Sequence, residues 1–278
     1  MLLNFSAAAI ITISAATLPT TPVEFSARPL GLYASERTAI ETVVPPQLAA
    51  LPPPGFTTLA RPAASELGVF GSVAISAARI PAARKWQDVQ KTDYSAYFGD
   101  SCSIQGFEGC DSRFVTKIRD ARNKAAGLGE RDMLDLINRT VNATMTYKPD
   151  SNVWGVGDYW ATPAEMARKG AGDCEDYAIA KYWLLRGLGV PDQNLQLVLL
   201  QDTRRQLFHA VLVAHMPSGS YVLDNVTDRL QLDTAYAQYQ PIMSFADGRS
   251  YIHGFAGGSR TATAMPTDLS AVAPGLGM

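Results

Sequence analysis

The segment with the clearest chemical potential runs from Gly172 to Tyr177 and reads GDCEDY. A helix is predicted to begin near Asp173, so Cys174 falls in its first turn after a glycine-rich approach. Unpaired backbone N–H groups at a helix start lower the pKa of a thiol and favour the nucleophilic thiolate. The same N–H groups can hold an oxyanion. The alternative is that Cys174 is a buried structural cysteine, a common position for a free thiol.

Two further residues could complete a catalytic set with this cysteine. His209 lies within an apolar run that predicts a strand, and Asp224 ends the next such run. Folding the two runs into a hairpin about Met216 and Pro217 places His209 opposite Asp224, where paired residues have Cβ atoms about 5 Å apart. A register slip of two would keep both on one face, whereas a slip of one would separate them.

Cys174, His209 and Asp224 would supply a nucleophile, a base and an orienting carboxylate, as in a catalytic triad with cysteine in place of serine. His209 would take the thiol proton and return it to the leaving group, while Asp224 would fix the imidazole tautomer. The alternative is that His209 is a satisfied core residue of an apolar strand. The remaining histidines, His215 and His253, are expected to be solvated.

Asp173, Glu175 and Asp176 place three carboxylates around Cys174. Their charge would raise the pKa of the thiol, because like charges disfavour its ionisation. They can be read as first-turn acids that interact with the helix dipole. They can also be read as a Ca²⁺ site, because hard cations bind several carboxylate oxygens, although the spacing is not that of an EF-hand loop. Bound Ca²⁺ would neutralise the repulsion and fix the helix start.

Length and composition exclude several classes of protein. The chain has 278 residues, with 24 Lys and Arg against 26 Asp and Glu, and 47% of its residues are hydrophobic. This balance argues against a nucleic-acid binder and against an acidic disordered chain, and the apolar content is that of a globular protein.

Three cysteines leave at least one thiol unpaired. Cys102 and Cys110 bracket a short glycine-containing loop that a disulfide could close in an exported protein.

The elements that must position the chemistry follow from periodicity and capping. Helices are predicted over residues 111–126, 130–144 and 173–186. A shorter helix begins with a capping box at Thr162 to Glu165 and ends at Gly170. Strands are predicted over residues 195–200, 208–214 and 221–224, and a loop over 147–157. The helix at 173–186 is apolar almost all round, which predicts a buried central helix. Helices followed by an antiparallel sheet indicate an α+β fold.

The two ends of the chain differ in composition from its middle. Residues 1–27 contain an uncharged apolar segment that suggests an export signal, with an anchor or a tail as alternatives; no basic residue precedes it. Residues 28–77 are predicted to be a Pro/Ala-rich disordered linker, and residues 257–278 a disordered tail. The folded domain is expected over residues 78–256. No other segment approaches a membrane-spanning length, so an integral membrane protein is not expected.

Three motifs give the sequence a specific resemblance. They are Asp158 to Tyr182, which includes DCEDYAIAKY, then His209 to Leu212, then Val222 to Asn225. Together they resemble the bacterial transglutaminase-like cysteine proteinase family, whose best-known members are the LapG-type periplasmic proteases. The resemblance extends over residues 80–250 of this chain.

The resemblance implies a papain-like, transglutaminase-core fold, in which N-terminal helices and a buried nucleophile helix pack on an antiparallel sheet. It implies the same triad, and Ca²⁺ dependence through Asp173, Glu175 and Asp176. LapG-type members cut large surface adhesins beside paired alanines and so release biofilm cells, and an inner-membrane receptor for cyclic di-GMP sequesters them. The implied function is therefore that of a calcium-dependent periplasmic cysteine endopeptidase with a protein substrate.

Two other functions are compatible with the same residues. Acyl transfer from the cysteine to an amine would crosslink proteins, and the sequence does not distinguish water from an amine as the acceptor. In a non-catalytic, calcium-gated binding module, Cys174 would only pack in the core. Its thiol would then react slowly with iodoacetamide at neutral pH.

Overall fold

The computed structural model describes residues 67–255, 266 and 268–275. The predicted export signal at residues 1–27 and most of the predicted linker at 28–77 lie outside the described residues. Within the part of the chain that is described, no helix has both the length and the apolar character needed to cross a bilayer.

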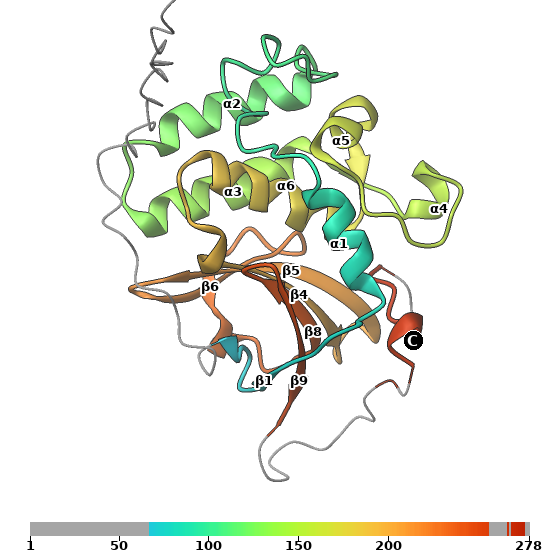
Figure 1. Cartoon of the computed structure of the whole chain (residues 1–278). Helices are drawn as coiled ribbons and strands as arrows, with labels where there is room; N and C mark the ends of the chain where they lie inside the picture. The colour runs from blue at the N-terminus through green and yellow to red at the C-terminus, as the bar shows by residue number, and fades with distance from the viewer. Residues whose placement is uncertain (1–66, 256–265, 267, 276–278) are drawn as a thin grey trace, which may run out of the picture. The chain divides into compact units, whose positions relative to one another are not determined.

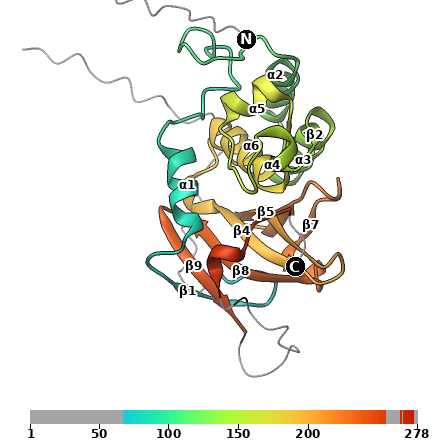
Figure 2. The ribbon, with the colours of Figure 1, turned by 90° about the vertical axis from the view of Figure 1, so that its right-hand side faces the viewer.

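The described residues form a layer of helices on one face of a seven-stranded sheet (Figures 1 and 2). The strands are β1 (Val73–Ser76), β4 (Leu195–Asp202), β5 (Leu207–Met216), β6 (Gly219–Leu223), β7 (Gln231–Leu232), β8 (Tyr239–Ala246) and β9 (Arg249–Gly254). They pair antiparallel in the order β1-β9-β8-β4-β5-β6-β7. The predicted α+β class is therefore confirmed.

The helices agree closely with the periodicity of the sequence. They are α1 (Ala82–Gln90), α2 (Arg113–Ala125), α3 (Glu130–Thr144), α4 (Asp150–Val153), α5 (Pro163–Lys169) and α6 (Cys174–Gly187). The predicted capping box at the start of α5 is present. The predicted loop at 147–157 was wrong in part, because Pro149 is extended and the short helix α4 begins directly after it.

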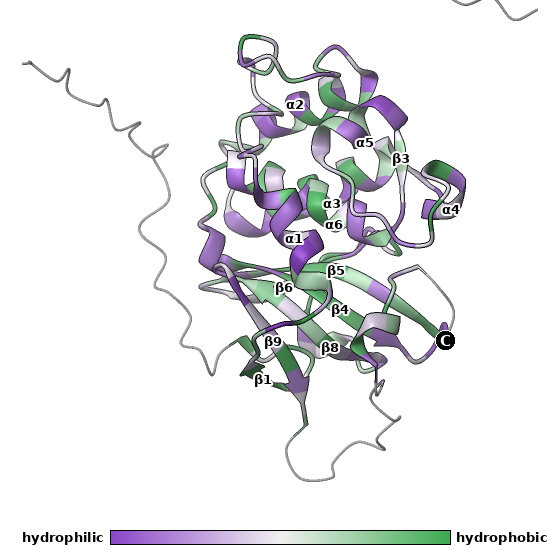
Figure 3. Cartoon of the chain, turned by 45° about the vertical axis from the view of Figure 1, so that its right-hand side comes forward, coloured by the Kyte–Doolittle hydropathy of each residue, from purple (hydrophilic) through white to green (hydrophobic). Residues whose placement is uncertain are grey.

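α6 is the central helix of the molecule. Every residue from Cys174 to Leu185 is buried, including Lys181. The helix packs against β5 and β4 on one side and α3 on the other. In Figure 3 the strands β4 and β8 are mostly hydrophobic, whereas the outer helix α1 is largely hydrophilic. The sequence-based prediction of a buried helix at this position is confirmed.

The central strands β4 and β5 are buried on both faces, which explains their continuous apolar sequences. One face belongs to the core beneath the helices. The other packs against a smaller cluster that includes Val69, Phe70, Tyr236 and Tyr239. His209 faces this smaller cluster, since its ring lies 5.8 Å from that of Tyr239.

The folded unit extends beyond the predicted boundaries at 78 and 256. Residues 73–76 form β1, which pairs with β9, and Phe70 is only 1% exposed. The end of the predicted linker is therefore part of the fold, because a four-residue edge strand leaves no periodicity that composition would reveal. In the predicted disordered tail, the described residues include a short 3₁₀ helix, Leu269–Ala271, and the buried Val272.

The β5–β6 hairpin has a different register from the predicted one. Val213 pairs with Val222 and Met216 with Gly219, a shift of two residues from a register that pairs His209 with Asp224. The physical reason is the tight turn: only two residues separate the paired Met216 and Gly219. A shift of two preserves the side-chain face, so His209 and Asp224 still meet, with Asp224 just beyond the end of β6.

Candidate active site

Cys174 is the first residue of α6, and the turn before it is tightly packed. α5 ends at Gly170, whose φ of +60° lies in the left-handed region that glycine adopts without strain. A Cβ on Gly172 would lie 2.2 Å from Asp176 Oδ2, so only glycine fits there. Asp176 Oδ2 in turn accepts a hydrogen bond from the N–H of Asp173 at 3.3 Å. These contacts set the position of the thiol at the start of the helix.

The Cys174 side chain is a buried free thiol with 1% exposure. Its Sγ lies 3.4 Å from Glu175 Oε2 and next to the N–H of Ala210 on β5. Burial, and then the charge of Asp173, raises the pKa of the Cys174 thiol well above its ordinary value, against the hydrogen bonds from Ala210 and Glu175. The expected lowering of the thiol pKa is therefore wrong here, because burial and the acids outweigh the helix start.

His209 and Asp224 form a buried pair, with 2.8 Å between His209 Nε2 and Asp224 Oδ1. Asp224 also accepts hydrogen bonds from the Tyr239 hydroxyl at 2.5 Å and from the Val226 N–H at 2.9 Å. Burial would raise the pKa of Asp224, but the charge of His209 and these hydrogen bonds hold it well below the usual range. The pair thus keeps Asp224 as a carboxylate and leaves Nδ1 of His209 for another partner.

Strand β5 lies between Cys174 and Asp224 in the sense that it contacts both of them. It carries His209, and the next residue, Ala210, presents its N–H to the sulfur of Cys174. Among the described residues, no hydrogen bond joins the thiol to the imidazole. Sequence reasoning missed Tyr239, because nothing in the local pattern distinguishes it from the other ten of the chain's 11 tyrosines.

Three carboxylates gather beside the nucleophile: Asp150, Asp173 and Glu175 each contribute one oxygen to a group within 4.8 Å of one another. Asp150 Oδ1, Asp173 Oδ1 and Glu175 Oε1 are buried and have no hydrogen-bond partner in the described part of the chain. Burial raises the pKa of Asp150 to about 7 and that of Asp173 to about 6, and raises the pKa of Glu175 well above its ordinary value. Such oxygens require a cation or a proton.

This acidic cluster differs from the predicted metal set in one member. Asp176 is buried, but its oxygens accept hydrogen bonds from the N–H groups of Asp173 and Ala161, so it closes the helix start instead. Asp150, at the start of α4, takes its place. Its Oδ2 accepts a hydrogen bond from the Tyr159 N–H. Sequence reasoning missed Asp150 because its segment was read as a loop far from the cysteine.

The other two histidines are buried, which contradicts the expectation that they are solvated. His215 bonds to Ser220 and Gln196, at 2.9 and 2.8 Å. His253 bonds to Ser72 and Ser244, at 2.8 and 2.7 Å. Burial lowers the pKa of each histidine to about 4, so both are neutral near pH 7. They link strands of the sheet, which their sequence positions near a turn and near the tail did not indicate.

The cysteines divide as the sequence predicted. Cys102 and Cys110 form a disulfide, with 5.8 Å between their Cα atoms. Cys174 is a free thiol.

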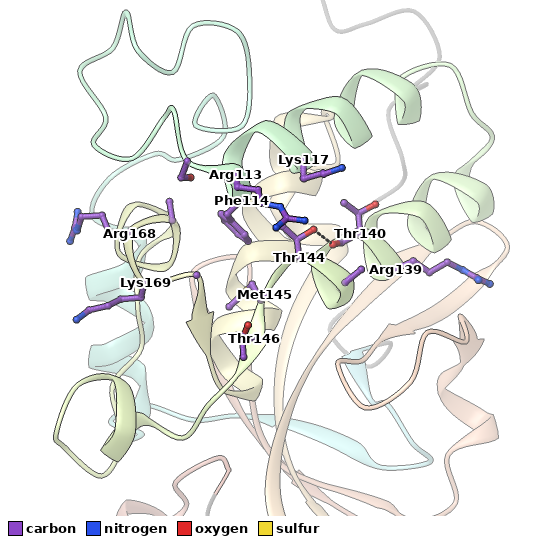
Figure 4. Close-up of a pocket in the computed structure, with 14 residues that line it drawn as sticks. Arg113, Phe114, Lys117, Arg139, Thr140, Thr144, Met145, Thr146, Arg168 and Lys169 are labelled. Atoms are coloured by element: carbon purple, nitrogen blue, oxygen red, sulfur yellow. Dashed lines mark hydrogen bonds between the residues drawn. The ribbon is translucent and has the colours of Figure 1, made fainter.

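A large pocket of about 810 Å³ lies among α2, α3 and α5 and contains none of the three candidate catalytic residues (Figure 4). Its rim carries several cationic side chains. Arg139 and Arg168 are each paired with an acid at 2.8 Å, and Lys169 stands over the ring of Trp154.

Comparisons with known proteins bear on the class of this site. The family model of the bacterial transglutaminase-like cysteine proteinases, BTLCP, matches residues 107–250. Legionella pneumophila LapG is 22% identical, with 64% of this chain and 90% of that chain covered and a TM-score of 0.45. A calcium-bound structure of Legionella pneumophila LapG is 23% identical, with 61% and 86% covered and a TM-score of 0.45.

No match was found among curated proteins. The family match is nevertheless extensive, because residues 107–250 make up more than half of the 278-residue chain. They also include α6, β5 and Asp224. The chain belongs to the bacterial transglutaminase-like cysteine proteinase family.

Proposed function

We propose that this protein is a calcium-dependent periplasmic cysteine endopeptidase, with Cys174 as nucleophile, His209 as base and Asp224 as orienting carboxylate. One observation carries the proposal: His209, which is paired with the buried Asp224, lies on the strand whose next N–H, that of Ala210, meets the thiol of Cys174. Family membership supports the reaction class, which is cleavage of a protein by a cysteine nucleophile.

The proposed reaction begins with transfer of the thiol proton from Cys174 to His209. The thiolate attacks the carbonyl carbon of the scissile peptide bond. Collapse of the tetrahedral intermediate breaks the C–N bond, and His209 gives its proton to the leaving amine, which leaves a thioester on Cys174. Water then attacks the thioester, His209 takes the water's proton and returns it to the sulfur, and the acid product leaves.

The hydrogen bonds around Asp224 support the proposed roles of His209 and Asp224. Asp224 holds the imidazole at Nε2, and the Tyr239 hydroxyl in turn donates to the other oxygen of Asp224, so that Nδ1 would remain for the proton transfers. The developing positive charge on His209 would be stabilised by a carboxylate whose pKa lies well below its usual range.

The acidic cluster of Asp150, Asp173 and Glu175 fits a Ca²⁺ ion. Each residue offers a hard oxygen donor that is buried and lacks a hydrogen-bond partner among the described residues. When bound, the ion would supply positive charge next to Cys174 and offset the carboxylates that raise the pKa of its thiol. Asp176 would support the site by holding the helix start.

For the substrate we propose an exported protein such as a large surface adhesin, whose cleavage would affect biofilm attachment. An inner-membrane cyclic-di-GMP receptor is the proposed regulator. Family membership motivates both proposals. The Cys102–Cys110 disulfide supports an oxidising compartment, as the periplasm is.

Cleavage of a recombinant adhesin fragment by purified variants tests the proposed function. Cys174→Ala should abolish cleavage with an unchanged thermal unfolding midpoint. Asp224→Asn should lower kcat by at least about 100-fold, because the imidazole loses its orienting charge. Asp100→Asn, at an exposed acid, is the control and should cleave normally. Undiminished cleavage by Cys174→Ala would contradict the assignment.

The acceptor is tested in the same assay. Incorporation of a labelled amine into a glutamine peptide, in preference to hydrolysis, would assign acyl transfer in place of peptide cleavage. Hydrolysis in the presence of excess amine would support the endopeptidase.

A further inference from the structure

The segment from Asp268 to Gly275 returns to the candidate active site. The N–H of Gly275 donates a hydrogen bond to the carbonyl of Phe208 at 2.9 Å. A Cβ on Gly275 would lie 3.2 Å from Asp173 Oδ2 and 3.4 Å from the hydroxyl oxygen of Tyr147. Phe208 directly precedes the proposed base, and Asp173 directly precedes the proposed nucleophile. The tip of the segment therefore bridges the two chain segments that carry the chemistry.

The same segment is anchored before it reaches the site. Asp268 caps the short 3₁₀ helix by accepting a hydrogen bond from the Ser270 N–H at 2.8 Å. Val272 is 4% exposed and joins the main core, and Leu269 packs against it. Figure 1 shows the segment in red at the edge of the sheet, on the side that carries α4. The anchored part of the segment therefore leads to Gly275, which lies beside Phe208 and Asp173.

Among the described strands, none pairs with the first half of β5 on the edge that β6 pairs with further along. Pairing with β6 covers only the second half of β5, from Leu212 to Met216, whereas pairing with β4 covers the first half as well. Alternate residues of a strand direct their main-chain groups to the same edge. Phe208 and Ala210 are such residues: one accepts from Gly275, and the other presents its N–H to the sulfur of Cys174.

We propose that residues 268–275 act as an internal pseudosubstrate. Gly275 meets the edge of β5 that no other described strand pairs with, through its hydrogen bond to the Phe208 carbonyl, and the segment would keep peptides and solvent away from the thiol of Cys174. Main-chain pairing to a strand edge is a general mode of peptide recognition. The term pseudosubstrate rests on the proposed peptidase function, whereas the occlusion of the thiol does not.

The tip is specific for glycine. Gly275 has a φ of +81°, and a side chain there would press on Asp173 and Tyr147. The occlusion also agrees with the burial of the site, since Cys174 and His209 are each 1% exposed. Catalysis would require the segment to leave, so an extended peptide in trans should compete with it for the same edge.

The rate of Cys174 alkylation by iodoacetamide tests the occlusion without requiring catalysis. We expect Gly275→Leu, in the full chain, to raise the rate at least tenfold by displacing the tip. The matched control is Gly106→Leu, since Gly106 has a similar φ of +74° but open space around it, and its rate should be unchanged.

Addition of the peptide DLSAVAPG, which copies residues 268–275, tests the binding edge itself. It should slow alkylation of the full-length Gly275→Leu chain, and a shuffled peptide should not. Equal alkylation rates in the natural chain and Gly275→Leu would overturn the inference, as would a peptide that gives no protection.

The two proposals fail in different ways. If the variants alkylate faster but no variant cleaves a protein in a manner dependent on Cys174, the peptidase function is wrong and the occlusion stands. If cleavage depends on Cys174 but alkylation rates do not differ, the function stands and the pseudosubstrate is wrong.

Discussion

Burial raises the pKa of each carboxylate near Cys174, and the neighbouring charges and hydrogen-bond donors decide whether that rise is reversed. Asp224 is buried with three hydrogen-bond donors, and its pKa lies well below the usual range. Asp150 and Glu175 are buried with an oxygen that lacks a partner among the described residues, and their pKa values are raised. The hydrogen-bonding needs of Asp224 are therefore met by the protein itself, whereas Asp150 and Glu175 are suited to bind an added cation.

This difference predicts that Ca²⁺ affinity depends on pH. Protons compete for Asp150 and Asp173, whose pKa values are about 7 and about 6, so binding measured by calorimetry should weaken as the pH falls from 8 to 5.5. Asp150→Asn should weaken binding at pH 8 by at least about tenfold and flatten the pH dependence. The exposed Asp111→Asn is the control. Equal affinity for Asp150→Asn and the natural chain would contradict this assignment of the site.

At the level of elements, α6 carries a buried lysine that has no part in the proposed reaction. Lys181 lies about two turns after Cys174 and has 0% exposure. Its Nζ has no hydrogen-bond partner among the described residues and stands 5.9 Å from the ring of Tyr177. Burial lowers the pKa of Lys181 to about 7, against the attraction of Asp224 and Asp228. The apolar surroundings that pack α6 therefore disfavour the charged form of the Lys181 amine.

Lys181 therefore predicts a pH dependence of stability in the alkaline range. Between pH 7 and the ordinary lysine pKa, the unfolded chain holds a proton that the folded chain releases, so the free energy of unfolding rises with pH. Lys181→Met keeps a similar volume and should lose this rise, measured by urea unfolding at pH 7, 8 and 9. The exposed Lys117→Met should retain it. A slope unchanged by Lys181→Met would show that the amine is not buried as described.

At the level of the whole molecule, buried histidines help to join distant strands into one sheet. His253 on β9 bonds to Ser72, which precedes β1, and to Ser244 on β8. Its pKa is lowered to about 4 by burial. The neutral imidazole of His253 thus links three neighbouring segments at this edge of the sheet.

The molecule should consequently lose stability in acid through this histidine. Between pH 6.5 and 4 the unfolded chain binds a proton that the folded chain excludes, so the free energy of unfolding falls as the pH falls. The advantage of the natural chain over His253→Gln should shrink by on the order of 1–3 kcal/mol across this range. Urea unfolding at pH 7 and pH 4.5 measures the difference. A constant difference would contradict a buried, neutral His253.

The local pattern of the sequence determined much of this protein. Capping and periodicity located α3 and α6, because the interactions that start and stop a helix lie within a few residues of one another. Spacing indicated the Cys102–Cys110 disulfide, and the motifs around Cys174 identified the family. The triad assignment stays a prediction, and the proximity of His209 to Asp224 agrees with it.

Tertiary structure decided the features that depend on residues far apart in the chain. The hairpin register followed from turn geometry, and Asp150 replaced Asp176 in the acidic cluster because α4 packs near the start of α6. Gly275 lies beside Asp173 and bonds to the carbonyl of Phe208, a placement that no local pattern encodes. Caps and periodicity are local interactions, whereas burial and register depend on which distant segments come together when the chain folds.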